Sequence, residues 1–135
     1  MFKTTLITLV FAALIVSGCS TRTMTLTERL ATLPADTVFR IEADTSFIEA
    51  WEIRLLQPVD HRNPDGPRFA QQIFLYYAGD DRPVVVETEG YGARGGRNEL
   101  ASLLNANLIR IEHRYFEESK PDSAGWKYLT TWQAA

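Results

Sequence analysis

Hydrophobic and polar residues alternate along two stretches in the first half of the chain. Residues 51–55 and 69–77 follow this two-residue rhythm and are rich in aromatic and β-branched side chains. Such a pattern predicts strands with one buried face. Because the two stretches are joined by the turn-forming segment from Pro58 to Pro67, we expect an antiparallel hairpin with a long connection.

Two later runs, Pro83–Val86 and Leu108–Ile111, are continuously apolar or nearly so. This pattern is typical of strands that are covered on both faces. Between them, residues 98–105 place three leucines on one side of a helix. A strand, a helix and a second strand predict a βαβ unit with parallel strands, so the expected fold class is α/β.

The segment in front of the hairpin, residues 19–46, is mostly polar. It contains one short helix candidate from Thr25 to Leu33, which a Thr25-x-x-Glu28 capping box would open and Pro34 would stop. We therefore expect a tether that precedes the folded domain.

The first 18 residues have the features of an export signal, with Lys3 followed by the apolar run Leu6–Val16. That run is too short to span a bilayer as a helix. It ends in Val16-Ser17-Gly18-Cys19, which resembles the lipobox of bacterial lipoproteins, and Ser20 fits sorting to the outer membrane. We expect an exported protein held in the bacterial cell envelope by a lipid on Cys19. The alternative is an ordinary signal peptide.

The charge of the chain narrows its possible partners, and its cysteine content limits what can stabilise its fold. Removal of residues 1–18 takes away one lysine, which leaves 13 basic against 17 acidic residues and a net charge of −4. A surface of this sign, without a basic block, argues against nucleic acid as a partner. Cys19 is the only cysteine, so stability must come from a buried core.

A glycine-rich segment follows the first of the two apolar strands. Gly90-Tyr91-Gly92-Ala93-Arg94-Gly95 matches G-x-G-x-x-G, and Glu112 lies 22 positions after Gly90, as in a dinucleotide fingerprint. Glu87 and Glu89, however, would repel a pyrophosphate there, and Gly96-Arg97 follows the third glycine where a helix should begin.

The same segment fits the oxyanion-hole loop of an acyl-transfer enzyme better. Gly90, Tyr91 and Gly92 would let the backbone approach a substrate and point an N–H group at a developing oxyanion. A simple chain turn is the alternative for these glycines.

Five sequence blocks in order resemble the secreted bacterial tripeptidyl aminopeptidases, family thirty-seven of the serine peptidases. The third and fourth blocks are also similar to the related prolyl carboxypeptidase family. The blocks are Gln57-Pro58-Val59-Asp60-His61, Thr88-Glu89-Gly90-Tyr91-Gly92, Glu112-His113-Arg114-Tyr115-Phe116, Ser119-Lys120-Pro121 and Trp126-x-Tyr128-Leu129-Thr130-x-x-Gln133-Ala134.

The resemblance implies an α/β-hydrolase fold with an inserted cap and a peptidase that removes N-terminal tripeptides, often after proline. Its serine, activated by histidine, would lie in a tight turn after the fifth strand. The chain stops before that strand, and Ser46, Ser102, Ser119 and Ser123 lack the glycines of a nucleophile elbow. We therefore expect residues 47–135 to be the N-terminal portion of the peptidase domain, inactive alone, without catalytic residue or cofactor.

The end of the chain also indicates a fragment. Thr130-x-x-Gln133 is a capping box, which normally opens a helix, and only two residues follow it.

The remaining candidates are charged or imidazole side chains near the expected site. A substrate ammonium group could bind a carboxylate, for which Glu87, Glu89 and Glu112 are suitable. Arg114 could join Glu89 and Glu112 in a buried charge network on the pocket floor.

We expect structural roles for His61, as a cap of the hairpin connection, and for His113, because neither has the partners that a metal site requires. Three other functions stay open: a complete, non-catalytic envelope lipoprotein that binds a partner, a lipase or esterase of the same fold, and a dinucleotide-binding Rossmann domain.

Overall fold

The computed structural model describes residues 22–122 and 125–134. The export signal, the proposed lipid anchor Cys19 and Ser123 lie outside the described residues. Within them, no helix is long and apolar enough to cross a membrane.

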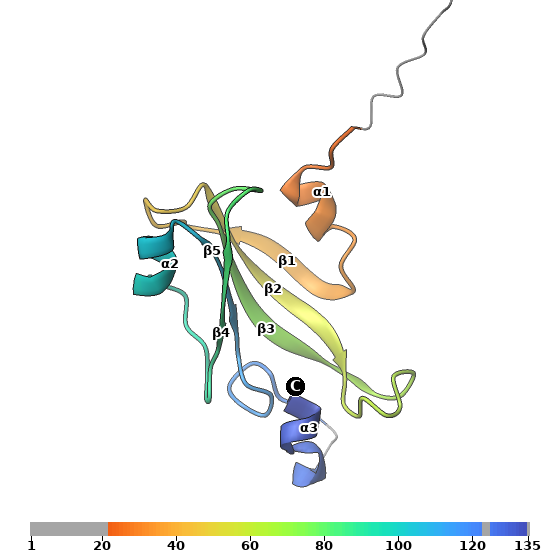
Figure 1. The fold of residues 1–135 in the computed structure, drawn as a ribbon. Coiled ribbons are helices and arrows are strands. Elements are labelled where there is room, and N and C mark those ends of the chain that lie inside the picture. The colour runs from red at the N-terminus through yellow and green to blue at the C-terminus, as the bar shows by residue number, and fades with distance from the viewer. Residues whose placement is uncertain (1–21, 123–124, 135) are drawn as a thin grey trace, which may run out of the picture.

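The fold is a single mixed sheet flanked by short helices (Figure 1). The strand order is β1-β2-β3-β5-β4. The strands are β1 (Ala35–Ile41), β2 (Glu49–Pro58), β3 (Arg68–Tyr77), β4 (Val84–Thr88) and β5 (Asn107–Ile111). The helices are α1 (Leu26–Leu30), α2 (Glu99–Leu104) and α3 (Thr131–Ala134), with a 3₁₀ turn at Trp126–Tyr128.

The predicted hairpin is confirmed as β2 and β3, which pair antiparallel along their whole length from Glu49↔Tyr77 to Pro58↔Arg68. The strands are longer than their alternating cores because the pairing continues to the connection, where Val59 N donates to Pro67 O at 2.9 Å. The hairpin is therefore the longest paired unit of the sheet.

The predicted βαβ unit is also confirmed, since β4 and β5 pair parallel from Val84↔Asn107 to Thr88↔Ile111. Asn98 opens α2 by accepting a hydrogen bond from Ala101 N at 2.8 Å. Asn105 closes it with φ 49°, a left-handed conformation that asparagine tolerates well.

Two details of this unit differ from the expectation. The side chains of Val84 and Val86 are more than half exposed, so β4 is not covered on both faces. On α2 it is Ala101 that is buried, whereas Leu100, Leu103 and Leu104 are exposed. The small Ala101 side chain faces the sheet and lets the helix approach it closely. The leucine side of α2 therefore faces away from the sheet.

The sequence predicts a polar tether over residues 19–46, but the structure places most of that segment in the fold. The Thr25–Glu28 capping box is confirmed, and α1 packs Leu30 into the core. Residues 35–41 form β1, which pairs antiparallel with β2 as an edge strand. Its polar residues Asp36, Thr37 and Arg40 interrupt the hydrophobic alternation from which a strand would be predicted. Charged and polar residues are common on edge strands, where they hinder pairing with another chain.

The core lies on both faces of the sheet, whereas the alternation in the sequence predicted strands with one buried face. Successive side chains of β2 and β3 point to opposite faces, and each face packs an apolar cluster. On one face Phe74, Tyr76 and Leu108 pack with Ala101 of α2. On the other, Trp51 and Ile53 pack with Leu30 of α1. Figure 1 shows α1 and α2 on opposite sides of the sheet.

We predict that Leu108→Ala destabilises the fold by about 2–5 kcal/mol, the usual cost of such a cavity, because Leu108 is fully buried in β5, which lies between β3 and β4. The matched control Leu103→Ala, at a leucine that is 82% exposed, should change stability by less than about 0.5 kcal/mol. Urea unfolding followed by tryptophan fluorescence measures both. Equal effects of the two substitutions would contradict the assignment of the core.

Candidate functional site

The two segments with unusual sequence meet at one end of the sheet. Because β4 and β5 are parallel, their carboxyl ends lie side by side, and the segments that follow them, residues 89–97 and 112–125, begin there (Figure 1). In open α/β sheets, ligands bind beyond the carboxyl ends of the strands. This edge is therefore the candidate site.

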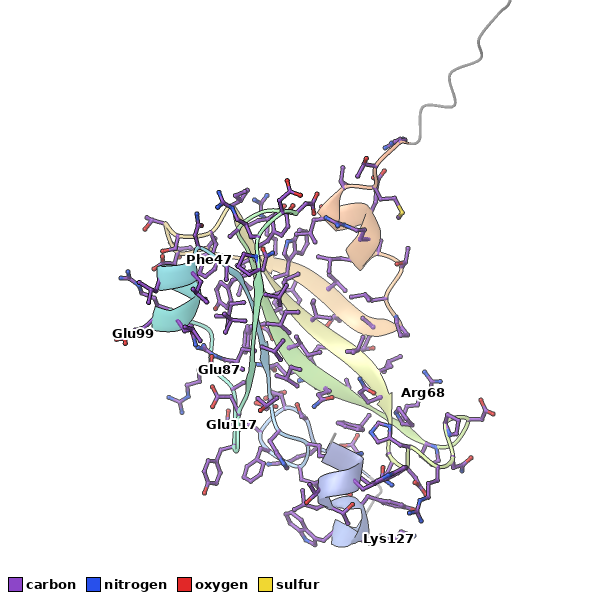
Figure 2. All side chains as sticks on the ribbon, in the orientation of Figure 1. Phe47, Arg68, Glu87, Glu99, Glu117 and Lys127 are labelled. Atoms are coloured by element: carbon purple, nitrogen blue, oxygen red, sulfur yellow. The ribbon has the colours of Figure 1, made fainter. Side chains whose placement is uncertain are left out.

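The glycine loop, residues 89–97, is held against the segment that follows β5. His113 N donates to Tyr91 O at 3.2 Å, and the Tyr91 ring lies edge-on to Phe116 with 5.2 Å between centroids. Glu117 lies near the end of β4 (Figure 2). Its carboxylate lies over Gly92, where a Cβ would come within 2.3 Å of Glu117 Cδ. Glycine at position 92 thus permits a close approach of the two segments.

The geometry beyond Gly92 does not follow a dinucleotide fingerprint. Gly95 packs on the Tyr76 hydroxyl, which accepts a hydrogen bond from Gly96 N at 2.6 Å. Helix α2 begins only at Glu99, so the third glycine of the pattern does not stand at the helix N-terminus. A pyrophosphate bound at the glycines would lack the helix end that normally stabilises it.

Glu112, at the carboxyl end of β5, connects both segments and is fully buried. Its Oε1 accepts from Ala93 N at 3.1 Å, in the glycine loop. Its Oε2 accepts from Glu118 N at 3.1 Å and from Ser119 Oγ at 2.6 Å. A buried carboxylate needs such donors, and here they come from two different segments.

The turn after β5 has an unusual backbone. Tyr115 and Glu117 have φ of 73° and 30°, in the left-handed region that is uncommon for residues other than glycine. Three backbone hydrogen bonds close the turn, among them Tyr115 N to Ser119 O at 2.9 Å and Ser119 N to Phe116 O at 2.7 Å. Conformations of this kind persist only where the surroundings determine them fully.

Glu87 and Glu89 share one cationic partner, Arg110, which was not predicted from the sequence. Arg110 Nε lies 2.8 Å from Glu87 Oε2 and 3.4 Å from Glu89 Oε1. Glu87 and Arg110 are direct partners in the β4–β5 register. The sequence signal for this ion pair was the arginine inside the apolar run Leu108–Ile111, because a nearly buried guanidinium requires a carboxylate partner.

Arg114 forms a separate set of contacts. Its guanidinium donates to the carbonyls of Val59, at 2.8 Å, and Gln133, and it lies over the Phe69 ring at 5.0 Å. Burial lowers the pKa of the Arg114 guanidinium, which Tyr115 and Asp60 partly oppose. The expected charge network of Arg114 with Glu89 and Glu112 therefore does not form. Each of these three side chains bonds to different partners.

The same three side chains nevertheless line one cavity. This cavity of about 320 Å³ opens at the carboxyl ends of β4 and β5. Its lining includes Thr88, Glu89, Glu112, His113 and Arg114. Of the three candidate carboxylates, Glu89 is the one that both lines the cavity and keeps a third of its side chain exposed.

Gln133 fastens α3 to the hairpin connection, which the sequence did not predict. Its side-chain amide donates to Asp60 Oδ1 at 2.7 Å and accepts from His61 N at 2.9 Å. The predicted capping box is thus only half present: Gln133 N approaches Thr130 Oγ1 at 3.3 Å, while the amide bonds elsewhere. His61 Nε2 lies 3.1 Å from Gln133 O, so this histidine contacts α3, and it is Asp60 that caps the turn.

The other polar candidates have structural contacts. His113 Nδ1 lies 2.7 Å from Arg114 O. Ser119 Oγ accepts from Gln72 N at 2.9 Å besides its bond to Glu112, and Ser102 Oγ donates to Asn98 O at 2.9 Å. Across the described ranges, no three His, Cys, Asp or Glu side chains form a group that could hold a metal ion.

The fold and the site define an α/β-like domain whose glycine loop and charged cavity meet beyond two parallel strands. The family model of PS-10 peptidase S37 matches residues 19–135. The chain belongs to this family of peptidases, which confirms the resemblance found in the sequence blocks.

The chain is also similar to the prolyl tri/tetrapeptidyl aminopeptidase of Streptomyces mobaraensis. The two are 41% identical over 81 residues, which are 58% of this chain and 17% of that relative. The match therefore spans only a small part of the length of the relative.

We predict that Gln133→Leu raises the pKa of Asp60 towards its usual value of about 3.9. The hydrogen bond from Gln133, followed by that from Arg62 N, holds the pKa of the Asp60 carboxyl below its usual value. A folded-state pKa below the unfolded one stabilises the fold above the unfolded pKa, and this stabilisation is lost as the pH falls through the folded pKa. NMR titration of the Asp60 carboxyl carbon measures the shift.

The control for this prediction is Gln57→Leu, which removes an amide of the same size from β2. It should leave the titration of Asp60 unchanged. An unchanged Asp60 titration in Gln133→Leu would show that the hydrogen bond from Gln133 to Asp60 does not form in solution.

Proposed function

We propose that the chain is the N-terminal portion of a serine exopeptidase of the tripeptidyl aminopeptidase type. The enzyme releases N-terminal tripeptides by acyl transfer through a serine that these residues do not contain. The observation that carries the proposal is that Gly90–Gly92 directly follow the carboxyl end of β4 in a chain of the S37 peptidase family. The name of the relative, a prolyl tri/tetrapeptidyl aminopeptidase, supports peptide substrates.

The fold that we propose for the whole domain is that of the α/β-hydrolases. The proposal is supported by the sheet order, in which the hairpin strand β3 pairs antiparallel with β5 and β5 pairs parallel with β4. In that fold the loop after the strand corresponding to β4 supplies an oxyanion-hole N–H group. Gly90, Tyr91 and Gly92 occupy this place, and Tyr91 is 74% exposed.

An aminopeptidase must also bind the free α-ammonium group of its substrate. We assign this role to Glu89, because its partly exposed carboxylate lines the cavity at the strand ends. Glu87 lies next to it and shares Arg110, while Glu112 and Arg114 shape the cavity floor. A partly buried carboxylate binds an ammonium group by a charge-assisted hydrogen bond.

We predict that a fluorophosphonate probe does not label this chain, because a single oxyanion loop cannot accelerate acyl transfer without a nucleophile and a base. The same probe should label a continuous gene product that carries a Gly-x-Ser-x-Gly segment downstream, and this product should release tripeptides from peptide nitroanilides. Labelling of the 135-residue chain would contradict the proposal. Hydrolysis of esters but not of peptides by the longer product would favour a lipase or esterase.

The proposed location is the bacterial cell envelope, with a lipid on Cys19. We predict that an alkyne-labelled fatty acid is incorporated into the chain in bacterial cells and that Cys19→Ser abolishes this incorporation. Ser20→Ala, next to the anchor, should leave it unchanged. In-gel fluorescence after coupling of a dye measures the label. Equal labelling of the Cys19→Ser variant would rule out this anchor.

A further inference from the structure

The glycine loop bonds to the sheet near its two ends, where Glu89 N donates to Ile111 O and Gly96 N donates to the Tyr76 hydroxyl, and its middle residues contact the segment after β5. Beyond the strand ends, Tyr91, Gly92 and Ala93 each contact that segment: Tyr91 at His113 and Phe116, Gly92 at Glu117, and Ala93 at Glu112. Of these contacts, the bond to Glu112 is the one that is charged and fully buried. Such a bond is strong, because the carboxylate has no water with which to exchange it.

The other oxygen of Glu112 is held firmly. Oε2 accepts from both Ser119 Oγ and Glu118 N, and Ser119 Oγ in turn accepts from Gln72 N of the central strand β3. The carboxylate is thus fixed to the sheet on one side and extends its remaining oxygen to Ala93 N on the other. A chain of hydrogen bonds therefore runs from β3 to the glycine loop.

We propose that Glu112 is a positioning residue, which sets the direction of the N–H groups of Gly90–Gly92 through its bond to Ala93. The carboxylate acts on the glycine loop and does not touch the substrate. The catalytic part of this inference rests on the proposed function, whereas the coupling between Glu112 and the loop is a property of the chain alone. It explains why a fully buried acid stands between two loops at the strand ends.

The substitution Glu112→Gln tests the coupling because an amide has one acceptor oxygen and one donor group. The oxygen should stay with Ser119 and Glu118, which provide two donors, so the amide NH₂ faces Ala93 N and cannot accept its hydrogen bond. We expect the Ala93 amide hydrogen to exchange roughly tenfold to hundredfold faster, as for the loss of a hydrogen bond to a charged group, while Glu118 stays protected. Hydrogen exchange followed by NMR on the ¹⁵N-labelled chain measures both amides.

The matched control is Glu118→Gln, which removes a neighbouring carboxylate that is 65% exposed and leaves the Glu118 N–H in place. It should not change the exchange of Ala93. Unchanged Ala93 exchange in a folded Glu112→Gln variant would overturn the proposal. If that variant does not fold, the coupling is measured in the wild-type chain as a through-hydrogen-bond NMR correlation between Ala93 N and the Glu112 carboxyl carbon. A correlation from Glu118 N without one from Ala93 N would overturn the proposal.

A catalytic readout separates positioning from a purely structural role. In the complete enzyme that the proposed function requires, Glu112→Gln should lower kcat by roughly 100-fold, with KM within about twofold, because small displacements of reacting groups carry such costs. A rise in KM with unchanged kcat would indicate direct substrate binding by Glu112 and overturn the proposal. If the wild-type enzyme cleaves no peptide, the proposed function fails, while the exchange of Ala93 still decides the coupling.

Discussion

The antiparallel pairing of β3 with β5 is the interaction on which the rest of the structure depends. It joins the local hairpin to the βαβ unit, from Ile73↔Ile111 to Tyr76↔Leu108, and so creates one sheet from two units that each form from neighbouring sequence. The pairing buries Leu108 against Tyr76 and brings Gln72 next to the segment after β5. Without it, Glu112 would have no fixed support.

Three buried polar side chains then organise the ends of the strands. Arg110 pairs with Glu87 of β4 and with Glu89 just after it. Glu112 joins the glycine loop to the turn after β5, and Arg114 joins that turn to the hairpin connection and to α3. Each is bonded to groups from at least two segments, so the loops are held by polar contacts where the apolar core ends. Such networks are costly when they are incomplete, and this cost makes the geometry of the site specific.

Local patterns were sufficient for the hairpin, the parallel pair and the cap of α1. Each of these depends on neighbouring residues, such as Thr25 with Glu28 or the alternation along residues 69–77. Local patterns did not predict β1, because polar residues interrupt its hydrophobic alternation. They also gave the wrong buried side of α2, where one alanine is buried in place of three leucines. In both cases the deciding contact is with residues far away in the chain.

The sequence by itself determined the family, the α/β class and the residues near the site, because the blocks from Gln57 to Gln133 and the hydrophobic rhythm are local properties. Only the tertiary structure decided the partners: Arg110 for Glu87 and Glu89, Ala93 and Ser119 for Glu112, and Asp60 for Gln133. The physical reason is that a polar side chain bonds to whichever partners the fold brings within about 3 Å. For Asp60 and Gln133 these lie 73 positions apart in the sequence.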